Sequence, residues 1–246
     1  MTTPLTLAST TVRADLDEQA ASLFNEHWPE FIFHDAGVKP FWARRGEYFA
    51  DWDFYALDDG RLVGAGYGVP LCWDGTPADL PGGYTDALRR SVTEHEDGTV
   101  PNTLVVMGAM VRKDEGGRGW AGAILRALRE EALGRGLVSV IAPVRPTLKQ
   151  RYPVTPIETF TGWTRADGLP LDPWVRTHVR LGASVLGCAP RSQTITGSVA
   201  EWESWTGLDL PSSGEYVIPD GLALLSVDRD ADTGVYHEPN IWMRHV

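Results

Sequence analysis

Runs of apolar residues along the 246-residue chain predict alternating strands and helices. Near-continuous apolar stretches over 103–111 (TLVVMGAMV) and 138–144 (VSVIAPV) are typical of strands that are buried on both faces. Between them, apolar residues recur at the spacing of one helix face: Ala121, Ile124, Leu125, Leu128 and Ala132. A strand, a helix and a strand with short links predict a βαβ-like unit.

Weaker patterns predict further elements on both sides of this unit. Expected strands cover residues 5–13, 53–56, 61–69, 192–199, 222–227 and 234–246. Expected helices cover residues 16–31, 84–96, 172–181 and 199–205, and Pro173 takes the first position of the third. Two runs rich in Pro and Gly, 71–82 and 152–172, favour loops. No linker separates these elements, so we expect one domain over 1–246 with a C-terminal elaboration from about residue 200.

A glycine-rich turn joins the strand over 103–111 to the helix that follows. Gly116, Gly117 and Gly119 lie within four positions, and the helix opens with the small residues of 121–123. Small residues let a ligand approach the backbone, and the free N–H groups at a helix start attract an anion. The turn therefore predicts a cradle for a phosphate-bearing ligand, with a plain tight turn as the alternative.

Composition narrows the class of partner. The formal net charge of −11 disfavours nucleic acid and anionic membranes, so an anionic ligand needs a local basic patch, which Arg112, Lys113 and Arg118 supply. We find no signal peptide and no apolar run long enough to span a bilayer. Cys72 and Cys188 lie far apart without metal-site spacing, which predicts free thiols in a cytoplasmic protein. No HExxH motif or ligand cluster indicates a metal.

Two common phosphate-binding motifs do not fit the turn. Residues 117–122 spell G-x-G-x-x-G, but the strand over 138–144 is not followed by the acid that a Rossmann dinucleotide site needs. A P-loop requires G-K-[ST], which is missing here.

The turn and its neighbours instead resemble the GNAT acyltransferase superfamily, whose motif Q/R-x-x-G-x-G/A follows a strand ending in Val. In the alignment based on Val111, the six motif positions are residues 116–121, GGRGWA. Gly116 stands where Gln or Arg is usual, whereas Gly119 and Ala121 match. The resemblance implies an α/β (α+β) fold with a mixed, largely antiparallel sheet, splayed central parallel strands and flanking helices.

This resemblance also implies a cofactor and the residues that hold it. The turn would bind the pyrophosphate of coenzyme A through backbone amides, and the pantetheine arm would run between the splayed strands. The donor is then acetyl-CoA or another acyl-CoA, although the phosphopantetheine of an acyl carrier protein fits a similar groove. The implied binding residues are Met110, Val111, Gly116, Gly117, Arg118, Gly119, Trp120 and Ala121.

Two residues compete for the position of the family's catalytic acid, which is commonly a Tyr. Tyr152 lies at the count of the pattern N-x-x-A-x-x-L-Y, although the Asn and Ala are missing. His178 takes the Tyr place of Y-x-x-x-G-F, with Gly182 matching the glycine. The alternatives are that Tyr152 packs against Trp163 and that His178 is a hydrogen-bonded core histidine. The other histidines show no partner in the sequence and are expected to be structural or exposed: His27, His34, His95, His237 and His245.

One branch of the superfamily is similar in two further runs. The GNAT-like domains of polyketide synthase initiation modules contain runs like RPTLK and DPWxRxH, which match residues 145–149 and 172–178. In that branch a Thr and a His act on a malonyl-type thioester and promote decarboxylation. The resemblance implies that Thr147 and His178 are these residues. Chemically, the Thr147 hydroxyl would orient the carboxylate, and the imidazole would either donate to the thioester oxygen or protonate the carbanion.

Three functions follow from these patterns. The first is an N-acyltransferase that uses acyl-CoA and a small-molecule amine, which is the commonest activity of the superfamily. The second is a GNAT-like decarboxylase or acyl transferase acting on malonyl-type thioesters of coenzyme A or of a carrier protein. The third is a non-catalytic acyl-CoA-binding protein. The segment 234–246 is either a sheet strand or a contact of a homodimer.

Overall fold

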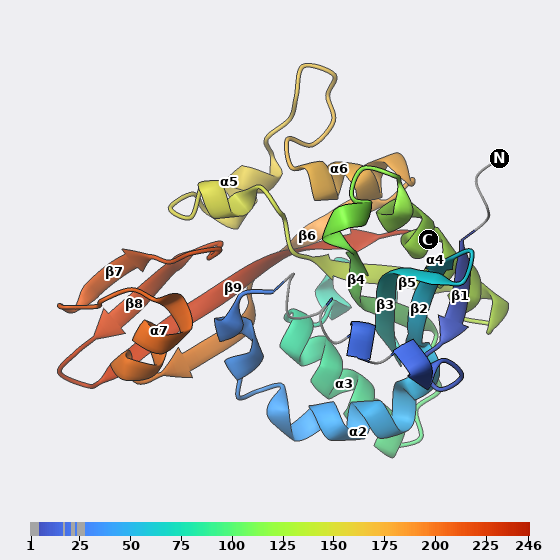
Figure 1. The fold of residues 1–246 in the computed structure, drawn as a ribbon, viewed down its shortest axis with the longest axis horizontal. Helices are drawn as coiled ribbons and strands as arrows, with labels where there is room; N and C mark the ends of the chain where they lie inside the picture. The colour runs from blue at the N-terminus through green and yellow to red at the C-terminus, as the bar shows by residue number, and fades with distance from the viewer. Residues whose placement is uncertain (1–4, 17, 21–22, 24–27) are drawn as a thin grey trace.

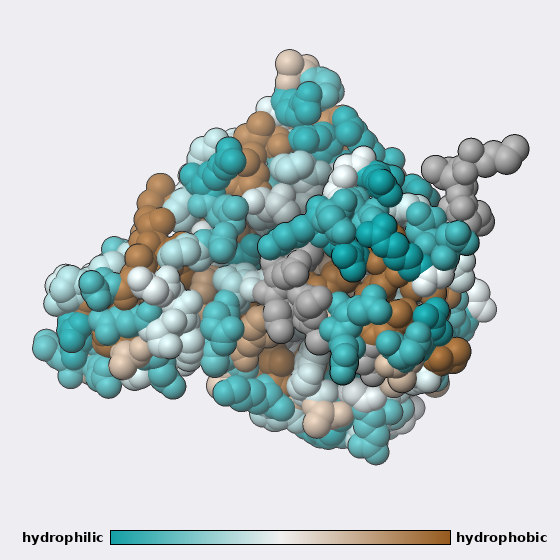
Figure 2. Space-filling view, in the orientation of Figure 1, coloured by the Kyte–Doolittle hydropathy of each residue, from teal (hydrophilic) through white to brown (hydrophobic). Residues whose placement is uncertain are grey.

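The computed structural model describes residues 5–16, 18–20, 23 and 28–246. The helix expected over 16–31 falls in part outside these residues, and its two ends coincide with the short 3-10 turns η1 (Ala14–Leu16) and η2 (Glu30–His34). Among the described residues, no helix is long and apolar enough to cross a membrane. The space-filling view shows a mostly hydrophilic face on which apolar patches are interrupted by polar side chains (Figure 2).

A single mixed sheet organises the molecule (Figure 1). Its strand order is β1-β2-β3-β4-β5-β9-β8-β7, with β6 paired to β9. The strands are β1 (Thr6–Ser9), β2 (Asp53–Asp58), β3 (Arg61–Leu71), β4 (Thr103–Val111), β5 (Ser139–Val144), β6 (Ser184–Gly197), β7 (Gly214–Val217), β8 (Leu224–Asp228) and β9 (Thr233–Arg244). All neighbouring strands are antiparallel except β4 and β5. The predicted fold class is confirmed.

Three helices pack on the two faces of β3: α2 (Lys39–Phe49), α3 (Tyr84–Glu96) and α4 (Trp120–Gly134). The other helices are α5 (Ile157–Thr161), which contacts β6 and β9, α6 (Pro173–Arg180), and α7 (Val199–Thr206), which contacts η2 and β9. Gly66 of β3 faces α4, where an added Cβ would lie 2.8 Å from the side chain of Leu128. The adjacent Tyr67 points to the other face and bonds Tyr84 of α3. Glycine in β3 thus lets α4 pack closely against the strand.

Helix α2 was not expected from the sequence. Its segment KPFWARRGEYF lacks an apolar stripe, because only Arg45 and Phe49 are buried along its length. Pro40 in the first turn suits a helix start. Two other elements differ from the expectation. Strand β1 is shorter than the strand expected over 5–13, and the short helix α5 lies inside the loop expected over 152–172.

The C-terminal part adds a second apolar core to the molecule. Trp202 of α7 packs against Phe31 and Tyr236 in a cluster that is separate from the main core. Strand β9 nevertheless lies in the middle of the sheet, where it pairs with β5 near one end and with β8 near the other. The residues expected to form an elaboration therefore also hold the central strands in place.

Candidate functional site

The two central parallel strands separate part-way along their length. Strands β4 and β5 pair at three positions, of which Val105↔Ile141 is the last. Beyond it, β5 pairs with β9 instead. A β-bulge at Met107 in β4 lies directly after the last parallel pair, since Gly68 opposes Val106 and Tyr67 opposes Gly108. Bulges bend a strand and redirect its side chains, so this one opens the gap between the strands.

The gap forms a cavity of about 280 Å³, which we call the splay cavity. Its lining includes Trp28, Gly108, Met110, Val111, Ala121, Arg145, Thr147, Trp174 and His178. The strand residues Met110 and Val111 and the helix residue Ala121, all predicted to hold the cofactor, thus meet the predicted chemical residues Thr147 and His178 in one cavity.

The glycine-rich turn presents open backbone at the start of α4. Gly117 and Gly119 have φ angles of +80° and +82°, and no atom lies within 4 Å of a Cβ built on either. Gly119 is the N-cap, and no side chain among the described residues caps this helix. At Gly116 an added Cβ would meet only the carbonyl oxygen of Lys113, at 3.4 Å, so the backbone also has room for the family's usual side chain.

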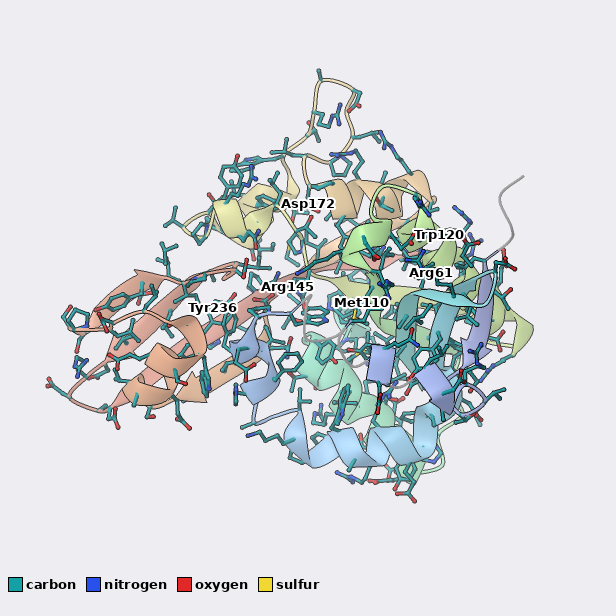
Figure 3. The ribbon with its side chains drawn as sticks, viewed as in Figure 1. Arg61, Met110, Trp120, Arg145, Asp172 and Tyr236 are labelled. Atoms are coloured by element: carbon teal, nitrogen blue, oxygen red, sulfur yellow. The ribbon has the colours of Figure 1, made fainter. Side chains whose placement is uncertain are left out.

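Carboxylates inside the turn already partner its arginines. Glu115 is buried and accepts from Arg61 at 2.7 Å and from Arg118 at 3.0 Å. Arg112 bonds Asp114 at 2.9 Å. Trp120, at the start of α4, adds a longer bond of 3.4 Å from its indole nitrogen to Glu115, and Figure 3 labels it beside Arg61. The cations Arg61, Arg112, Lys113 and Arg118 outnumber the carboxylates Asp114 and Glu115. The turn therefore keeps a net positive charge while the ion pairs hold its arginines in place.

The imidazole of His178 lies buried on α6 with one ring nitrogen occupied. Its Nδ1 is 2.8 Å from Nε2 of His245, which follows β9. Burial, together with the neighbouring His245 ring, lowers the pKa of His178 to about 3. Burial and the positive charge of Arg129 lower the pKa of His245 to about 4. Both rings are therefore neutral near pH 7, so one donates to the other in their shared hydrogen bond.

The second ring nitrogen of His178 has no protein partner. Its Nε2 is buried and makes no hydrogen bond with any described residue. The ring packs edge-on against Trp174, with centroids 4.4 Å apart, and lines the splay cavity. Leaving a buried polar atom unbonded costs about 1–3 kcal/mol, so such an atom beside a cavity indicates a ligand that satisfies it.

One buried carboxylate joins the two segments that match the polyketide synthase branch. Asp172 is the N-cap of α6 and accepts from the backbone N–H groups of Trp174 and Val175, each at 2.9 Å. It also accepts from the N–H of Leu148 at 2.6 Å. The residue after Thr147 is thereby tied to the helix that carries His178. Asp172 is the labelled residue above the sheet in Figure 3.

Sequence reasoning missed two residues of this site. Asp172 sits at a helix start with Pro173 after it, which is a capping signal, but its bond to Leu148 depends on the fold. His245 was expected to be structural or exposed without a recognisable partner; it is buried, and its partner is His178. They lie 67 positions apart, so no local pattern reveals the pair.

Tyr152 lies apart from the splay cavity and is not among its lining residues. Its ring packs edge-on against Trp163 with centroids 4.9 Å apart, and the residue is 37% exposed. This is the packing alternative considered for it. The role of Tyr152 as an acid stays a prediction, while the structure brings Thr147 and His178 together.

The histidine pair predicts that acid destabilises the fold. Both pKa values lie below the usual 6.5, so the unfolded chain binds more protons and stability is lost as the pH falls below about 6.5. We expect the free energy of unfolding to drop by about 2 kcal/mol or more between pH 7 and pH 5, measured by urea denaturation.

The double variant His178→Gln, His245→Gln serves as the comparison. It should lose much of the fall in stability between pH 7 and pH 5, because both shifted histidines are removed. His237, whose pKa is also lowered, is present in both proteins and contributes equally to each. Asp79 and Asp114 have pKa values below the usual range of Asp, so they titrate below pH 5 and do not add to the change between pH 7 and pH 5. Parallel stability curves for the two proteins would contradict the lowered pKa values.

Comparisons with known proteins agree with this geometry. No family model matches the chain. An arginine N-acetyltransferase from Aspergillus versicolor is 28% identical, over 89% of this chain and 84% of that protein. The loading GNATL domain of CurA from Lyngbya majuscula has a TM-score of 0.56 at 13% identity, over 98% of this chain and 96% of that one. The GphF GNAT-like decarboxylase in complex with isobutyryl-CoA has a TM-score of 0.55 at 18% identity, over 97% of both chains.

The two solved structures show the fold of the chain. The chain has the GNAT fold, with its parallel pair β4–β5 inside an otherwise antiparallel sheet. In sequence, the chain is similar to an N-acetyltransferase.

Proposed function

We propose that this protein is an acyl-CoA-dependent acyltransferase that acts on a small-molecule amine. The observation that carries the proposal is the splay cavity, which reaches Val111 and Ala121 on the two sides of the glycine-rich turn and is also lined by His178, whose Nε2 is unbonded. Anions bind at helix starts, and an acyl thioester needs a hydrogen-bond donor where negative charge develops.

The residues of the turn fit coenzyme A. Open backbone at Gly117 and Gly119 and the uncapped start of α4 suit a pyrophosphate, and the edge of β4 at Met110 and Val111 suits the pantetheine amides. Coenzyme A supplies an acyl group activated as a thioester. The similarity to an N-acetyltransferase supports acetyl-CoA as the donor.

His178 is assigned the role of a neutral hydrogen-bond donor. A pKa of about 3 makes its ring a weak base at neutral pH, since an efficient base has a pKa near the working pH. When His245 donates its Nε2 hydrogen to Nδ1 of His178, the remaining hydrogen of His178 sits on Nε2. That hydrogen would bond the thioester oxygen and stabilise the charge that forms on it. His245 is then a positioning residue, because it fixes this tautomer.

Decarboxylation of a malonyl-type thioester is the second candidate, because Thr147 and His178 line the same cavity. The bond between the carboxylate carbon and the α-carbon would break, CO₂ would leave, and the electron pair would pass into an enolate that is protonated on carbon. The same His178 donor would stabilise the enolate oxygen. Arg145 also lines the cavity, where buried Glu238 holds its guanidinium at 2.5 Å.

One set of incubations separates the candidates. The protein is mixed with acetyl-CoA or with malonyl-CoA, each with and without an amine, and free thiol and CO₂ are followed. We expect thiol release from acetyl-CoA only when an amine is present; arginine belongs in the panel because the curated relative is named for it. Conversion of malonyl-CoA to acetyl-CoA and CO₂ without an amine would support the second candidate. Tight binding of coenzyme A without any turnover would contradict both.

A further inference from the structure

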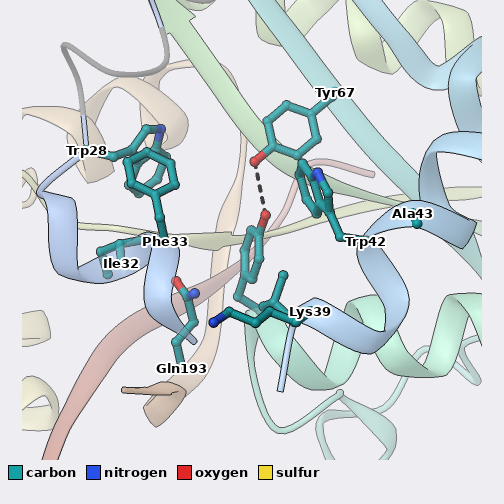
Figure 4. Close-up of a pocket in the computed structure, with 10 residues that line it drawn as sticks. Trp28, Ile32, Phe33, Lys39, Trp42, Ala43, Tyr67 and Gln193 are labelled. Carbon is teal, nitrogen blue, oxygen red and sulfur yellow. Dashed lines mark hydrogen bonds between the residues drawn. The ribbon is translucent and has the colours of Figure 1, made fainter. Parts of the chain in front are cut away.

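A second cavity, of about 380 Å³, lies next to the splay cavity between η2, α2 and β6 (Figure 4). Trp28 and Phe33 stand on one side of it, and Trp42 and Tyr67 stand on the other. We call it the aromatic cavity. Phe33 and Trp42 are 46% and 44% exposed, which is unusual for such large apolar side chains and leaves the cavity open to solvent.

The aromatic cavity shares a wall with the splay cavity. Trp28 lines both of them. The ring of Tyr67 also lies directly over Gly108 of β4, where an added Cβ would be 2.3 Å from the ring. Gly108 itself lines the splay cavity, so only one side chain and the backbone of β4 separate the two spaces at this point. A molecule in the aromatic cavity therefore sits beside the place assigned to the acyl group.

The polar groups of the aromatic cavity disfavour a polycation. Burial raises the pKa of both Tyr67 and Tyr84, whose hydroxyls bond each other at 3.0 Å and stay neutral. Lys39 is the one charged side chain among the described residues that line the cavity. No lining residue in the described chain is a carboxylate. A polyamine would meet the Lys39 cation here, whereas Asp35, a carboxylate behind the lining, already accepts from Gln193 at 3.5 Å and from Thr85 at 2.5 Å.

The aromatic rings themselves favour a flat and uncharged group. The guanidinium of Arg45 already lies over the rings of Trp42 and Tyr67, at 5.4 and 5.1 Å from their centroids, and is paired with Asp53. Electron density drawn to one face of a ring is less available to a cation on the other. Stacking of a planar group between the rings carries no such penalty.

We propose that the aromatic cavity binds the acceptor, and that the acceptor is a primary amine carrying a planar group and a carboxylate. The planar group stacks among Trp28, Phe33 and Trp42, and the carboxylate pairs with Lys39. The primary amine rests on the proposed acyl transfer, whereas the planar group and the carboxylate rest on the cavity alone. Lys39 is the residue that determines specificity for the carboxylate.

Matched acceptors test the proposal directly. Phenylalanine is compared with phenethylamine, and tryptophan with tryptamine, which differ only by the carboxylate; spermidine represents polyamines. With saturating acetyl-CoA, we expect kcat/KM for each amino acid to exceed that for its decarboxylated partner by about tenfold, the effect of one ion pair worth about 1.4 kcal/mol. Spermidine should be the poorest acceptor.

Two variants assign the effect to the cavity. Lys39→Gln should abolish the preference for the carboxylate, whereas Lys113→Gln, which removes the same charge at the glycine turn, should keep it and change the KM for acetyl-CoA instead. Trp42→Ala should raise the KM of both members of each pair, because Trp42 is part of the stacking surface.

Calorimetric titration of the same compounds separates this inference from the proposed function. Phenylalanine or tryptophan could bind the wild-type protein but not Lys39→Gln, and could bind without being acylated. That result would contradict the proposed acyltransferase function and support the proposed ligand class. Binding or turnover of spermidine or phenethylamine equal to that of phenylalanine would overturn the inference. So would the lack of binding by every compound, or unchanged binding in Trp42→Ala.

Discussion

Replacing His178 with Ala is expected to lower the kcat of acyl transfer by about 10²–10³-fold, the loss typical of one hydrogen-bond donor at a developing oxyanion. The Kd for acetyl-CoA should change little, because the glycine turn that would hold the phosphates is formed by other residues. Stopped-flow or steady-state thiol release gives kcat, and calorimetry with coenzyme A gives the Kd. A kcat within about twofold of wild type would remove His178 from the mechanism.

His95→Ala is the matched control for this variant. His95 is exposed on α3 and contacts Tyr48 and Phe49, so its loss removes an imidazole without touching the splay cavity. It should keep wild-type kcat.

His245→Phe tests the positioning role separately. This variant leaves the His178 ring in place but removes the donor to its Nδ1, so the tautomer is no longer fixed. We expect an intermediate loss of kcat. The pKa of His178 should stay low, because burial, the larger of its two causes, remains when His245 is replaced.

The pH profile distinguishes a neutral donor from a base. With a pKa of about 3, His178 in the wild-type protein stays neutral across the physiological range, so kcat should show no step near pH 6.5 from this residue. A step at that pH that disappears in His178→Ala would contradict the donor role and assign proton transfer to the ring.

Those parts of the fold that depend on local pattern could be predicted from the sequence. The periodic apolar residues of α4, the apolar run of β5 and the Asp172–Pro173 start of α6 each contain their own signal. Helix α2 has no such signal, because its burial of Arg45 depends on an ion pair with Asp53 in another element. Tertiary contacts, not periodicity, define that helix.

The candidate site divides in the same way. The turn at Gly117 and Gly119 is a local feature, and its open backbone was expected from small residues alone. Thr147 and His178 came from a family resemblance, since nothing near either in the sequence indicates a common cavity. The bulge at Met107 and the bond between His178 and His245 arise only when distant segments meet, so no pattern within one segment encodes them.

Replacing Gly119 with Asp is expected to weaken acyl-CoA binding by about 100-fold. The new carboxylate would stand at the N-cap of α4, where a phosphate is proposed to bind, and like charges in contact cost several kcal/mol. Asp tolerates the left-handed conformation better than most residues, so the φ of +82° and the open space around the position allow the chain to fold. The Kd for coenzyme A is measured by calorimetry.

Gly136→Asp makes this experiment decisive, because it repeats every feature of the change except its place. Gly136 follows the other end of α4, has a φ of +89°, and has no atom within 4 Å of an added Cβ. Both variants therefore bear similar backbone strain and the same added charge, although the helix dipole opposes the carboxylate at Gly136, so Gly136→Asp should lose more stability. Only Gly119→Asp places that charge at the positive end of the helix dipole. If both variants bind coenzyme A equally well, the phosphate cradle is not at this turn.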